Sequence, residues 1–195
     1  MQIDVETNIY FVRHAQPDFS VKNDRQRPLT QKGMRDRELA TKALQNIKIK
    51  KVYSSPYKRA FDTVKHLADI NNLEIHVVED FRERKANDEG VADFKSFSRK
   101  QWEDFNFKLK SGECLKEVQQ RNITALFKVL KNNLGSNVVV GTHGTALSTI
   151  INYFDHDFGY EDFWGIIDKM PYVICIKFKN EEFVRMKELE LVSGA

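Results

Sequence analysis

The sequence has few cysteines, glycines and prolines, and it lacks long apolar runs. Its two cysteines, Cys114 and Cys175, lie far apart without a CxxC spacing, which speaks against a disulfide framework and a zinc cluster. Nine glycines and four prolines exclude a collagen-like chain, and a content of 41% hydrophobic residues excludes a disordered one. No apolar run approaches the roughly 20 residues that cross a bilayer, and the N-terminus has no signal-peptide pattern. We therefore expect a soluble globular protein of the cytoplasm.

An excess of charge of either sign is also missing. Lysine and arginine number 31 against 28 aspartates and glutamates, which leaves a net charge of +3. That is far below the excess that by itself indicates a nucleic-acid partner. We expect neither a nucleic-acid nor a membrane partner, and the sequence leaves the oligomeric state open. A length of 195 residues suits a single domain, residues 1–195, with room for a small cap.

Strand-like and helix-like segments alternate along most of the chain. Short β-rich apolar runs are followed by segments whose apolar residues recur at helical spacing, which predicts βαβ units and a largely parallel central sheet. We expect a three-layer α/β/α fold with helices on both faces of this sheet. The expected strands are 9–12, 51–53, 74–78, 138–140, 172–178 and 183–189, and the expected helices begin after Thr30, near Pro56, at Leu115 and after Gly144.

Residues 84–112 interrupt this alternation. They carry mixed charge, several aromatic residues and no clean periodicity, so we expect an inserted lid or cap with short helices. The basic and aromatic side chains of this segment suit two roles equally, a cover over a phosphorylated substrate or a small core with a solvated face.

Three of the expected strands end in polar residues. Arg13-His14 follows the first strand, Ser54-Ser55 follows the second, and Thr142-His143 follows the valines at 138–140. Open α/β sheets bind ligands beyond the carboxyl ends of their strands. We therefore expect the three polar segments to meet at one edge of the sheet and to form the functional site.

Two histidines and two arginines at this edge would make a positive pocket for a phosphoryl group. The planar arginine fork matches phosphate oxygens, and a neutral imidazole can attack phosphorus in line. We expect His14 to be the nucleophile. Arg13 and Arg59 would neutralise the phosphoryl oxygens, and His143 would donate a further hydrogen bond. The helix that begins after Thr142 adds backbone N–H groups to the pocket.

Phosphoryl transfer from an alcohol also needs a group that protonates the leaving alkoxide and later accepts a proton from water. Glu83, just past the third expected strand, is the expected acid, and Asp80, Glu79 and Glu89 remain alternatives. Arginine and histidine supply the positive charge in this scheme. It therefore requires no metal ion and no cofactor.

The motifs around these residues resemble those of the histidine phosphatase superfamily, also called the phosphoglycerate mutase-like family. The resemblance runs from about Ile9 to Ile151 and rests on Arg13-His14-Ala15, Pro28-Leu29-Thr30 with Gly33, Ser54-Ser55-Pro56 with Arg59-Ala60, Gly112-Glu113 with Arg121, and Gly141-Thr142-His143-Gly144. It implies that His14 is the residue that becomes phosphorylated. It also implies that Arg13, Arg59 and His143 bind the phosphoryl group and that Glu83 is the proton donor.

Further residues are expected to contact the substrate. They are Ser20, Arg84, Lys85, Thr142 and Gly144. Ser20 stands where many members of the family carry an asparagine six residues beyond the nucleophile, so a hydroxyl would replace an amide there. Arg84 and Lys85 adjoin the expected acid in the sequence.

Departures from the mutase pattern favour a phosphatase. The GWxD stretch that often precedes the Pro28-Leu29-Thr30 motif in mutases is absent, the sequence 84–87 after the acid differs, and the interval from Glu83 to His143 is short. We expect a metal-independent phosphatase that hydrolyses a phosphorylated small molecule through a phosphohistidine on His14. A phosphoglycerate mutase and a non-catalytic phospholigand-binding module are the alternatives, and the identity of the substrate stays open.

Overall fold

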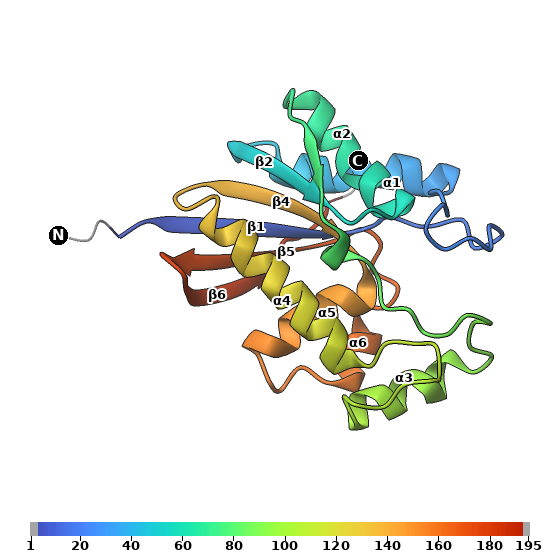
Figure 1. Ribbon diagram of the computed structural model, residues 1–195. Coiled ribbons are helices and arrows are strands. Elements are labelled where there is room, and N and C mark those ends of the chain that lie inside the picture. The colour runs from blue at the N-terminus through green and yellow to red at the C-terminus, as the bar shows by residue number, and fades with distance from the viewer. Residues whose placement is uncertain (1–3, 193–195) are drawn as a thin grey trace.

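A computed structural model describes residues 4–192 and places a six-stranded sheet at its centre, in the order β3-β2-β4-β1-β5-β6 (Figure 1). The strands β1 to β4 pair in parallel, whereas β5 runs antiparallel to both β1 and β6. The bounds of the strands are Glu6–Arg13 (β1), Ile49–Ser54 (β2), Ile75–Val77 (β3), Asn137–Thr142 (β4), Tyr172–Lys179 (β5) and Glu182–Glu188 (β6).

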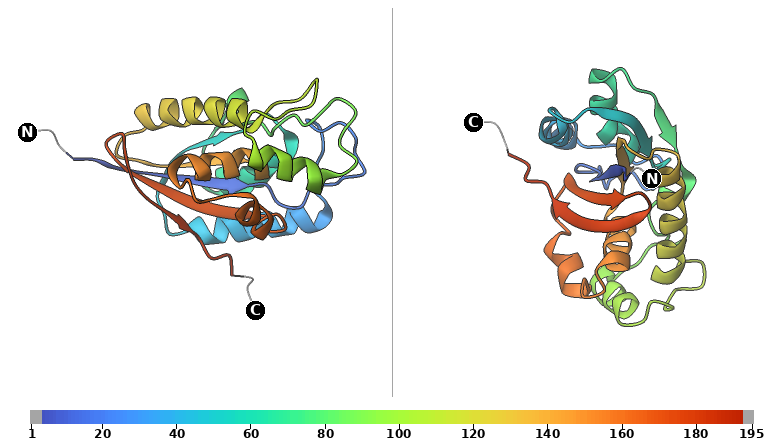
Figure 2. Two further views of the ribbon diagram at one scale, coloured as in Figure 1. Left: turned by 90° about the horizontal axis from the view of Figure 1, so that it is seen from below. Right: turned by 90° about the vertical axis from the view of Figure 1, so that its left-hand side faces the viewer.

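Helices lie on both faces of this sheet, as Figure 2 shows. Successive side chains of a strand point to opposite faces, and in β1 both sets are apolar. Ile9 and Phe11 pack with residues of α4 (Leu115–Lys131) and α5 (Gly144–Phe154). Tyr10 and Val12 pack with residues of α1 (Gln31–Leu44) and α2 (Lys58–Ile70). The three-layer α/β/α fold expected from the sequence is therefore confirmed.

The start of α1 shows how local sequence sets an element boundary. Thr30 has an extended backbone, and its hydroxyl accepts a hydrogen bond from the N–H of Gly33 at 3.0 Å. This is the N-cap expected of that threonine. A side chain at position 33 would not fit, because a Cβ there would lie 2.3 Å from the carbonyl oxygen of Gln16. The cap and the glycine together fix the helix against the segment that follows β1.

The 84–112 segment forms one helix, α3 (Phe94–Glu103), rather than several short ones. Its aromatic side chains pack against α6 (Tyr160–Gly165), with ring centroids 5.8 Å apart for Trp102 and Phe163 and 6.1 Å apart for Phe94 and Trp164. Figure 1 shows α3 beside α6, away from the α1 side of the sheet. Aromatic residues of the 84–112 segment therefore form a small core together with α6.

Two features go beyond what the sequence indicated. The strands expected at 172–178 and 183–189 are confirmed, but their antiparallel direction was not assigned from the sequence.

The helix α6 was not expected, because six residues are too few to show a clear helical period. A short 3₁₀ turn, Glu79–Phe81, follows β3 and leads into the segment that carries Glu83.

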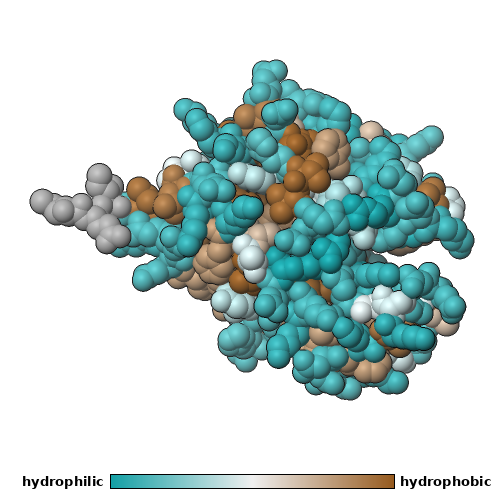
Figure 3. Space-filling view, in the orientation of Figure 1, coloured by the Kyte–Doolittle hydropathy of each residue, from teal (hydrophilic) through white to brown (hydrophobic). Residues whose placement is uncertain are grey.

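Hydrophilic side chains dominate the molecular face seen in Figure 3, with apolar residues scattered among them. Single exposed apolar residues of this kind are normal on protein surfaces. None of the helices within residues 4–192 has the length and apolar character that a bilayer crossing requires.

Candidate active site

The carboxyl ends of β1, β4 and β2 lie next to one another in the sheet. Beyond β1, the backbone N–H of His14 donates to the carbonyl of Thr142 at 3.0 Å. Beyond β2, the N–H of Ser55 donates to the carbonyl of Gly141 at 2.9 Å. The structure thus brings together the three polar segments at one edge, as parallel strands of this order require.

His14 is buried at this edge, with 6% of its surface exposed. Its Nδ1 lies 2.8 Å from the carbonyl oxygen of Ala15. A carbonyl only accepts hydrogen bonds, so Nδ1 carries the hydrogen and Nε2 carries the lone pair. Burial, followed by the positive charges of Arg59 and Arg13, holds the pKa of His14 well below its usual value. The imidazole is therefore neutral at pH 7, with the lone pair of its ring on Nε2.

His143 lies directly beside His14, with the two ring centroids 5.3 Å apart in an edge-on arrangement. Its Nε2 is 2.7 Å from the Ser55 hydroxyl, which also accepts a hydrogen bond from the N–H of Tyr57. The Ser55 hydroxyl has one hydrogen to donate, and where Nε2 accepts it the neutral ring of His143 carries its own hydrogen on Nδ1. Burial and the nearby Arg59 keep the pKa of His143 well below its usual value as well.

Arg13 is fixed by backbone carbonyls that follow α6. Its Nη1 donates to Ile166 at 2.7 Å and its Nη2 donates to Ile167 at 2.8 Å, while Nε is buried without a partner among the described residues. Burial lowers the pKa of Arg13 to about 10, so the side chain remains charged at neutral pH. A Cβ on Gly144 would lie 3.2 Å from the guanidinium. Glycine at the start of α5 therefore lets this arginine approach the helix end closely.

Arg59 is supplied by the first turn of α2 and is almost fully buried. Its Nη1 donates to the carbonyl of Asp24 at 2.6 Å and lies 3.1 Å from the Asp24 carboxylate. The same carboxylate accepts a hydrogen bond from Arg27 at 2.6 Å. The guanidinium of Arg59 also lies 5.0 Å from the ring centroid of Tyr57. One aspartate thus holds two arginines, both of which depress the pKa of His14 by their charge.

Glu83 lies at the amino end of α5, where helix N–H groups lack partners of their own. Its Oε2 accepts a hydrogen bond from Thr145 and its Oε1 accepts one from Ala146, both at 3.1 Å. Its own neighbour Arg84 donates a third N–H to Oε1 at 2.7 Å. Oε1 thus accepts two of these hydrogen bonds and Oε2 accepts one.

The other acidic candidates point elsewhere or make no contact with α5. Glu79 forms a paired hydrogen bond with Arg25 at 2.8 and 2.9 Å on the exposed surface. The carboxylate of Asp80 lies 3.6 Å from Arg82, and Glu89 is exposed in the loop before α3. Of the four acids weighed from the sequence, the structure brings Glu83 to the helix end beside the histidines.

The expected substrate-binding residues divide into two groups. Thr142 and Gly144 lie at the site, and the Thr142 hydroxyl is buried without a partner among the described residues. Ser20, Arg84 and Lys85 are engaged elsewhere. Ser20 is exposed and donates to Asp18 at 2.6 Å, and Lys85 pairs with Asp88 at 2.7 Å. Arg84 donates to Gln101 and lies over the rings of Phe94 and Phe97 of α3. Their contact with substrate remains a prediction.

Sequence reasoning missed two residues that support the site. Tyr57 packs edge-on against His143, with ring centroids 5.1 Å apart, and burial raises the pKa of its hydroxyl. Asp24 bonds Arg59, whereas Ser55, which bonds His143, belongs to a segment that the sequence placed at the site. Tyr57 directly follows the Ser54-Ser55-Pro56 motif, so that motif was the available signal. Asp24 lies in an irregular segment whose path the sequence pattern does not reveal.

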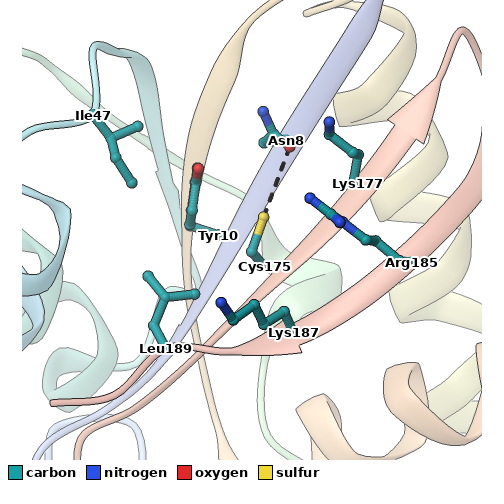
Figure 4. Close-up of a pocket in the computed structure, with 8 residues that line it drawn as sticks. All are labelled: Asn8, Tyr10, Ile47, Cys175, Lys177, Arg185, Lys187 and Leu189. Atoms are coloured by element: carbon teal, nitrogen blue, oxygen red, sulfur yellow. Dashed lines mark hydrogen bonds between the residues drawn. The ribbon is translucent and has the colours of Figure 1, made fainter.

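A cavity of about 330 Å³ lies elsewhere on the molecule (Figure 4). It is lined by side chains of β1, β5 and β6 together with Ile47 and Leu189. No residue expected at the active site lines it, so it is separate from the cluster of histidines and arginines. Within residues 4–192, no group of three or more His, Cys, Asp or Glu side chains is arranged to hold a metal ion.

Comparison with known proteins agrees with this arrangement. A model of the histidine phosphatase superfamily (branch 1) matches residues 9–188. A 2,3-bisphosphoglycerate-dependent phosphoglycerate mutase of Thermoplasma acidophilum is 32% identical over 169 residues, which cover 80% of this chain and 79% of that protein.

Solved structures share the fold. The structure of Bacillus stearothermophilus YhfR superimposes with a TM-score of 0.77 at 24% identity, covering 91% of this chain and 94% of that one. A mycobacterial glucosyl-3-phosphoglycerate phosphatase superimposes with a TM-score of 0.74 at 16% identity, covering 96% of this chain and all of that one. At these identities the likeness shows the fold alone. The family match over most of the chain and the relative at 32% identity show that this chain belongs to the histidine phosphatase superfamily, as its motifs predicted.

Proposed function

We propose that the protein is a phosphatase that hydrolyses a phosphorylated small molecule through a phosphohistidine on His14. The observation that carries this proposal is the state of His14. Its hydrogen is held on Nδ1 by the Ala15 carbonyl, its pKa is low, and two arginines depress that pKa from close by. A neutral imidazole with a free Nε2 beside fixed positive charge is the arrangement that in-line attack on a phosphoryl group needs.

In the first step, Nε2 of His14 attacks phosphorus while the bond from phosphorus to the alcohol oxygen breaks. Charge on the phosphoryl oxygens is neutralised by Arg13 and Arg59, whose guanidinium positions are fixed before the reaction by protein carbonyls. His143 adds a hydrogen bond from Nδ1, which has no partner among the described residues. Such a preset cationic cluster favours the transition state because it needs no reorganisation.

Glu83 supplies the proton that the leaving oxygen requires. In the second step the same carboxylate takes a proton from water, whose oxygen bonds to phosphorus as the bond to Nε2 of His14 breaks. Glu83 is protonated again at the end, so the cycle balances without another reactant. Its place at the start of α5, on the hydrogen bonds from Thr145 and Ala146, supports this role.

The cycle as written draws its positive charge from side chains. Arg13, Arg59 and His143 serve the purpose that a metal ion serves in other phosphatases. We therefore include metal independence in the proposal. Activity should persist when divalent cations are removed with a chelator.

Phosphoglycerate mutase activity is the second candidate, and the relative from Thermoplasma acidophilum favours it. The two activities share the phosphohistidine and differ in the acceptor, which is water in a phosphatase and a second hydroxyl in a mutase. We prefer the phosphatase because the sequence around Glu83 and the 84–87 segment departs from the mutase pattern.

Phosphate release from a panel of phosphomonoesters, including 3-phosphoglycerate, tests the proposal. The assay contains a chelator, and His14→Ala serves as the blank. His156→Ala is the matched control, because His156 is an exposed histidine in the loop after α5. We expect release that disappears in His14→Ala and persists in His156→Ala. Isomerised 3-phosphoglycerate without net phosphate release would decide for the mutase.

A further inference from the structure

The segment that carries Glu83 has little regular structure of its own. After the 3₁₀ turn Glu79–Phe81, the chain from Arg82 to residue 93 has no helix or strand. Phe81 anchors one end, since it is fully buried and its ring lies 6.1 Å from that of Phe11. A catalytic carboxylate on an irregular segment needs further support, because a displacement of about 1 Å can cost a hundredfold in rate.

One arginine of α4 provides contacts along this segment. Arg121 donates from Nη1 to the carbonyl of Asp80 at 2.7 Å and to that of Arg82 at 2.8 Å. It donates from Nη2 to the carbonyl of Glu83 itself at 3.3 Å. A single guanidinium therefore binds three carbonyls within four consecutive residues, including the carbonyl of the proposed acid.

Glu113 completes the arrangement. Its carboxylate accepts from Nε of Arg121 at 2.9 Å and from Nη2 at 3.0 Å, and it also accepts from the N–H of Lys85 at 2.9 Å and from Arg82 at 2.8 Å. Burial raises the pKa of Glu113, but the hydrogen bonds from Arg121 and Lys85 outweigh it and leave the net pKa below its usual value. The carboxylate is thus ionised at neutral pH and ties the backbone on the far side of Glu83 to α4.

The geometry leaves Arg121 no role in binding substrate. A guanidinium has five N–H donors, and in Arg121 each of them has an acceptor: three backbone carbonyls and both oxygens of Glu113. The turn before Glu113 also packs on the same segment, since a Cβ at Gly112 would lie 2.2 Å from the carbonyl oxygen of Ala86. These contacts lie on both sides of Glu83.

We propose that Glu113 and Arg121 are positioning residues that hold the Glu83 carboxylate at the amino end of α5 for its acid–base role. This inference rests on the proposed function and adds a requirement to it. Lysine at position 121 keeps the charge but has three donors on one nitrogen, so it cannot bind three carbonyls and a carboxylate at once. Glutamine at position 113 keeps the shape but loses the ionic acceptor for Arg121.

The test compares two esters in a single turnover, so that only transfer to His14 is followed. Phenyl phosphate has a basic leaving group that needs a proton, whereas 2,4-dinitrophenyl phosphate has a leaving group that departs without one. We expect Arg121→Lys and Glu113→Gln to slow the release of phenol by about a hundredfold. The same variants should release dinitrophenol at nearly the wild-type rate, because Arg13, Arg59 and His14 are undisturbed.

The matched control is Arg37→Lys. Arg37 is likewise partly buried and donates to one backbone carbonyl, that of Asp62 at 2.9 Å, on the other face of the sheet. It should slow neither ester. Equal slowing of both esters by Arg121→Lys and Glu113→Gln would overturn the positioning role, because it would indicate general damage to the phosphoryl site. Unchanged rates with both esters would overturn it too.

A double-mutant comparison gives an independent readout. In a Glu83→Gln background the acid is already absent, so Arg121→Lys should cause almost no further loss with phenyl phosphate. Losses that multiply would overturn the inference. Failure of the proposed function gives a different result, since the wild-type protein would then release neither phenol nor dinitrophenol in the first turnover.

Discussion

The rings of His14 and His143 lie edge-on with centroids 5.3 Å apart, and one ring nitrogen of each histidine is hydrogen-bonded to an oxygen. His14 bonds the carbonyl of Ala15, and His143 bonds the hydroxyl of Ser55. Both are buried beside arginines, so both are neutral at pH 7. His14 thereby keeps the lone pair on Nε2, and the neighbouring His143 keeps an N–H on Nδ1 when its Nε2 accepts from Ser55.

Because both rings are buried in the neutral form, the free energy of unfolding should fall as the pH is lowered. Because the folded pKa of His14 lies below the unfolded value of 6.5, the unfolded chain binds a proton that the folded chain does not as the pH falls below that value. Each such histidine should lower the unfolding free energy between pH 7.5 and pH 5.5, by at most about 1.4 kcal/mol. Urea unfolding at the two pH values measures this.

The pH dependence of stability in the wild type is compared with that of His14→Gln. His156→Gln, at an exposed histidine, is the control. We expect the variant at position 14 to lose less stability than the wild type over this interval, by about the contribution of one histidine. The control should follow the wild type. An unchanged pH dependence in His14→Gln would show that this ring is not held neutral.

Gly144→Ala tests the close approach of Arg13 to α5. The added Cβ would lie 3.2 Å from a guanidinium that three carbonyls hold in place, at Ile166, Ile167 and Lys169. We expect kcat/KM to fall about tenfold or more as Arg13 shifts. Gly165→Ala is the control, because nothing lies within 4 Å of a Cβ there. Equal activity of the two variants would count against the importance of the Arg13 position.

Tyr57 is expected to act through its ring. The ring contacts His143 and lies 5.0 Å from the guanidinium carbon of Arg59. Loss of such a cation–π contact in Tyr57→Leu should lower kcat/KM by about tenfold. Tyr57→Phe keeps the ring and should retain activity close to that of the wild type. A large loss in Tyr57→Phe would instead assign a role to the hydroxyl.

Glu83→Gln should lower turnover of alkyl and phenyl phosphates by about a hundredfold to ten-thousandfold, which is the contribution of a general acid. Binding of inorganic phosphate, measured by calorimetry, should remain because the arginines are unchanged. Glu89→Gln is the matched control, since Glu89 is an exposed acid on the same stretch of chain. Loss of turnover in Glu89→Gln with normal turnover in Glu83→Gln would reverse the assignment.

Much of the fold and of the candidate active site could be predicted from the sequence. The alternation in β1, with Ile9 and Phe11 against Tyr10 and Val12, indicates a strand covered on both faces, and parallel pairing then brings Arg13-His14 beside Thr142-His143. These conclusions need only local periodicity and the geometry of parallel sheets.

The parts that escaped prediction depend on long-range contacts. Asp24 and Arg59 are 35 residues apart in the sequence, and Asp80 and Arg121 are 41 residues apart. The local periodicity of apolar residues predicts neither contact. Arg84 follows Glu83 in the sequence, yet its side chain bonds Gln101 of α3 while that of Glu83 bonds the amino end of α5. Adjacent residues in an irregular segment have no fixed relation between their side-chain directions, so proximity in sequence was a poor guide there.

The central claim is that His14 carries the phosphoryl group. The protein is mixed with a phosphomonoester that it hydrolyses and is quenched in alkali, which preserves phosphohistidine, before the modified peptide is sequenced by mass spectrometry. We expect one added phosphoryl group, on His14, and none in His14→Ala. With 2,4-dinitrophenyl phosphate, whose leaving group departs without a proton, the group should accumulate in Glu83→Gln, because only the later attack of water then needs the carboxylate. Turnover without any phosphorylated His14, or a phosphoryl group on another residue, would contradict the account.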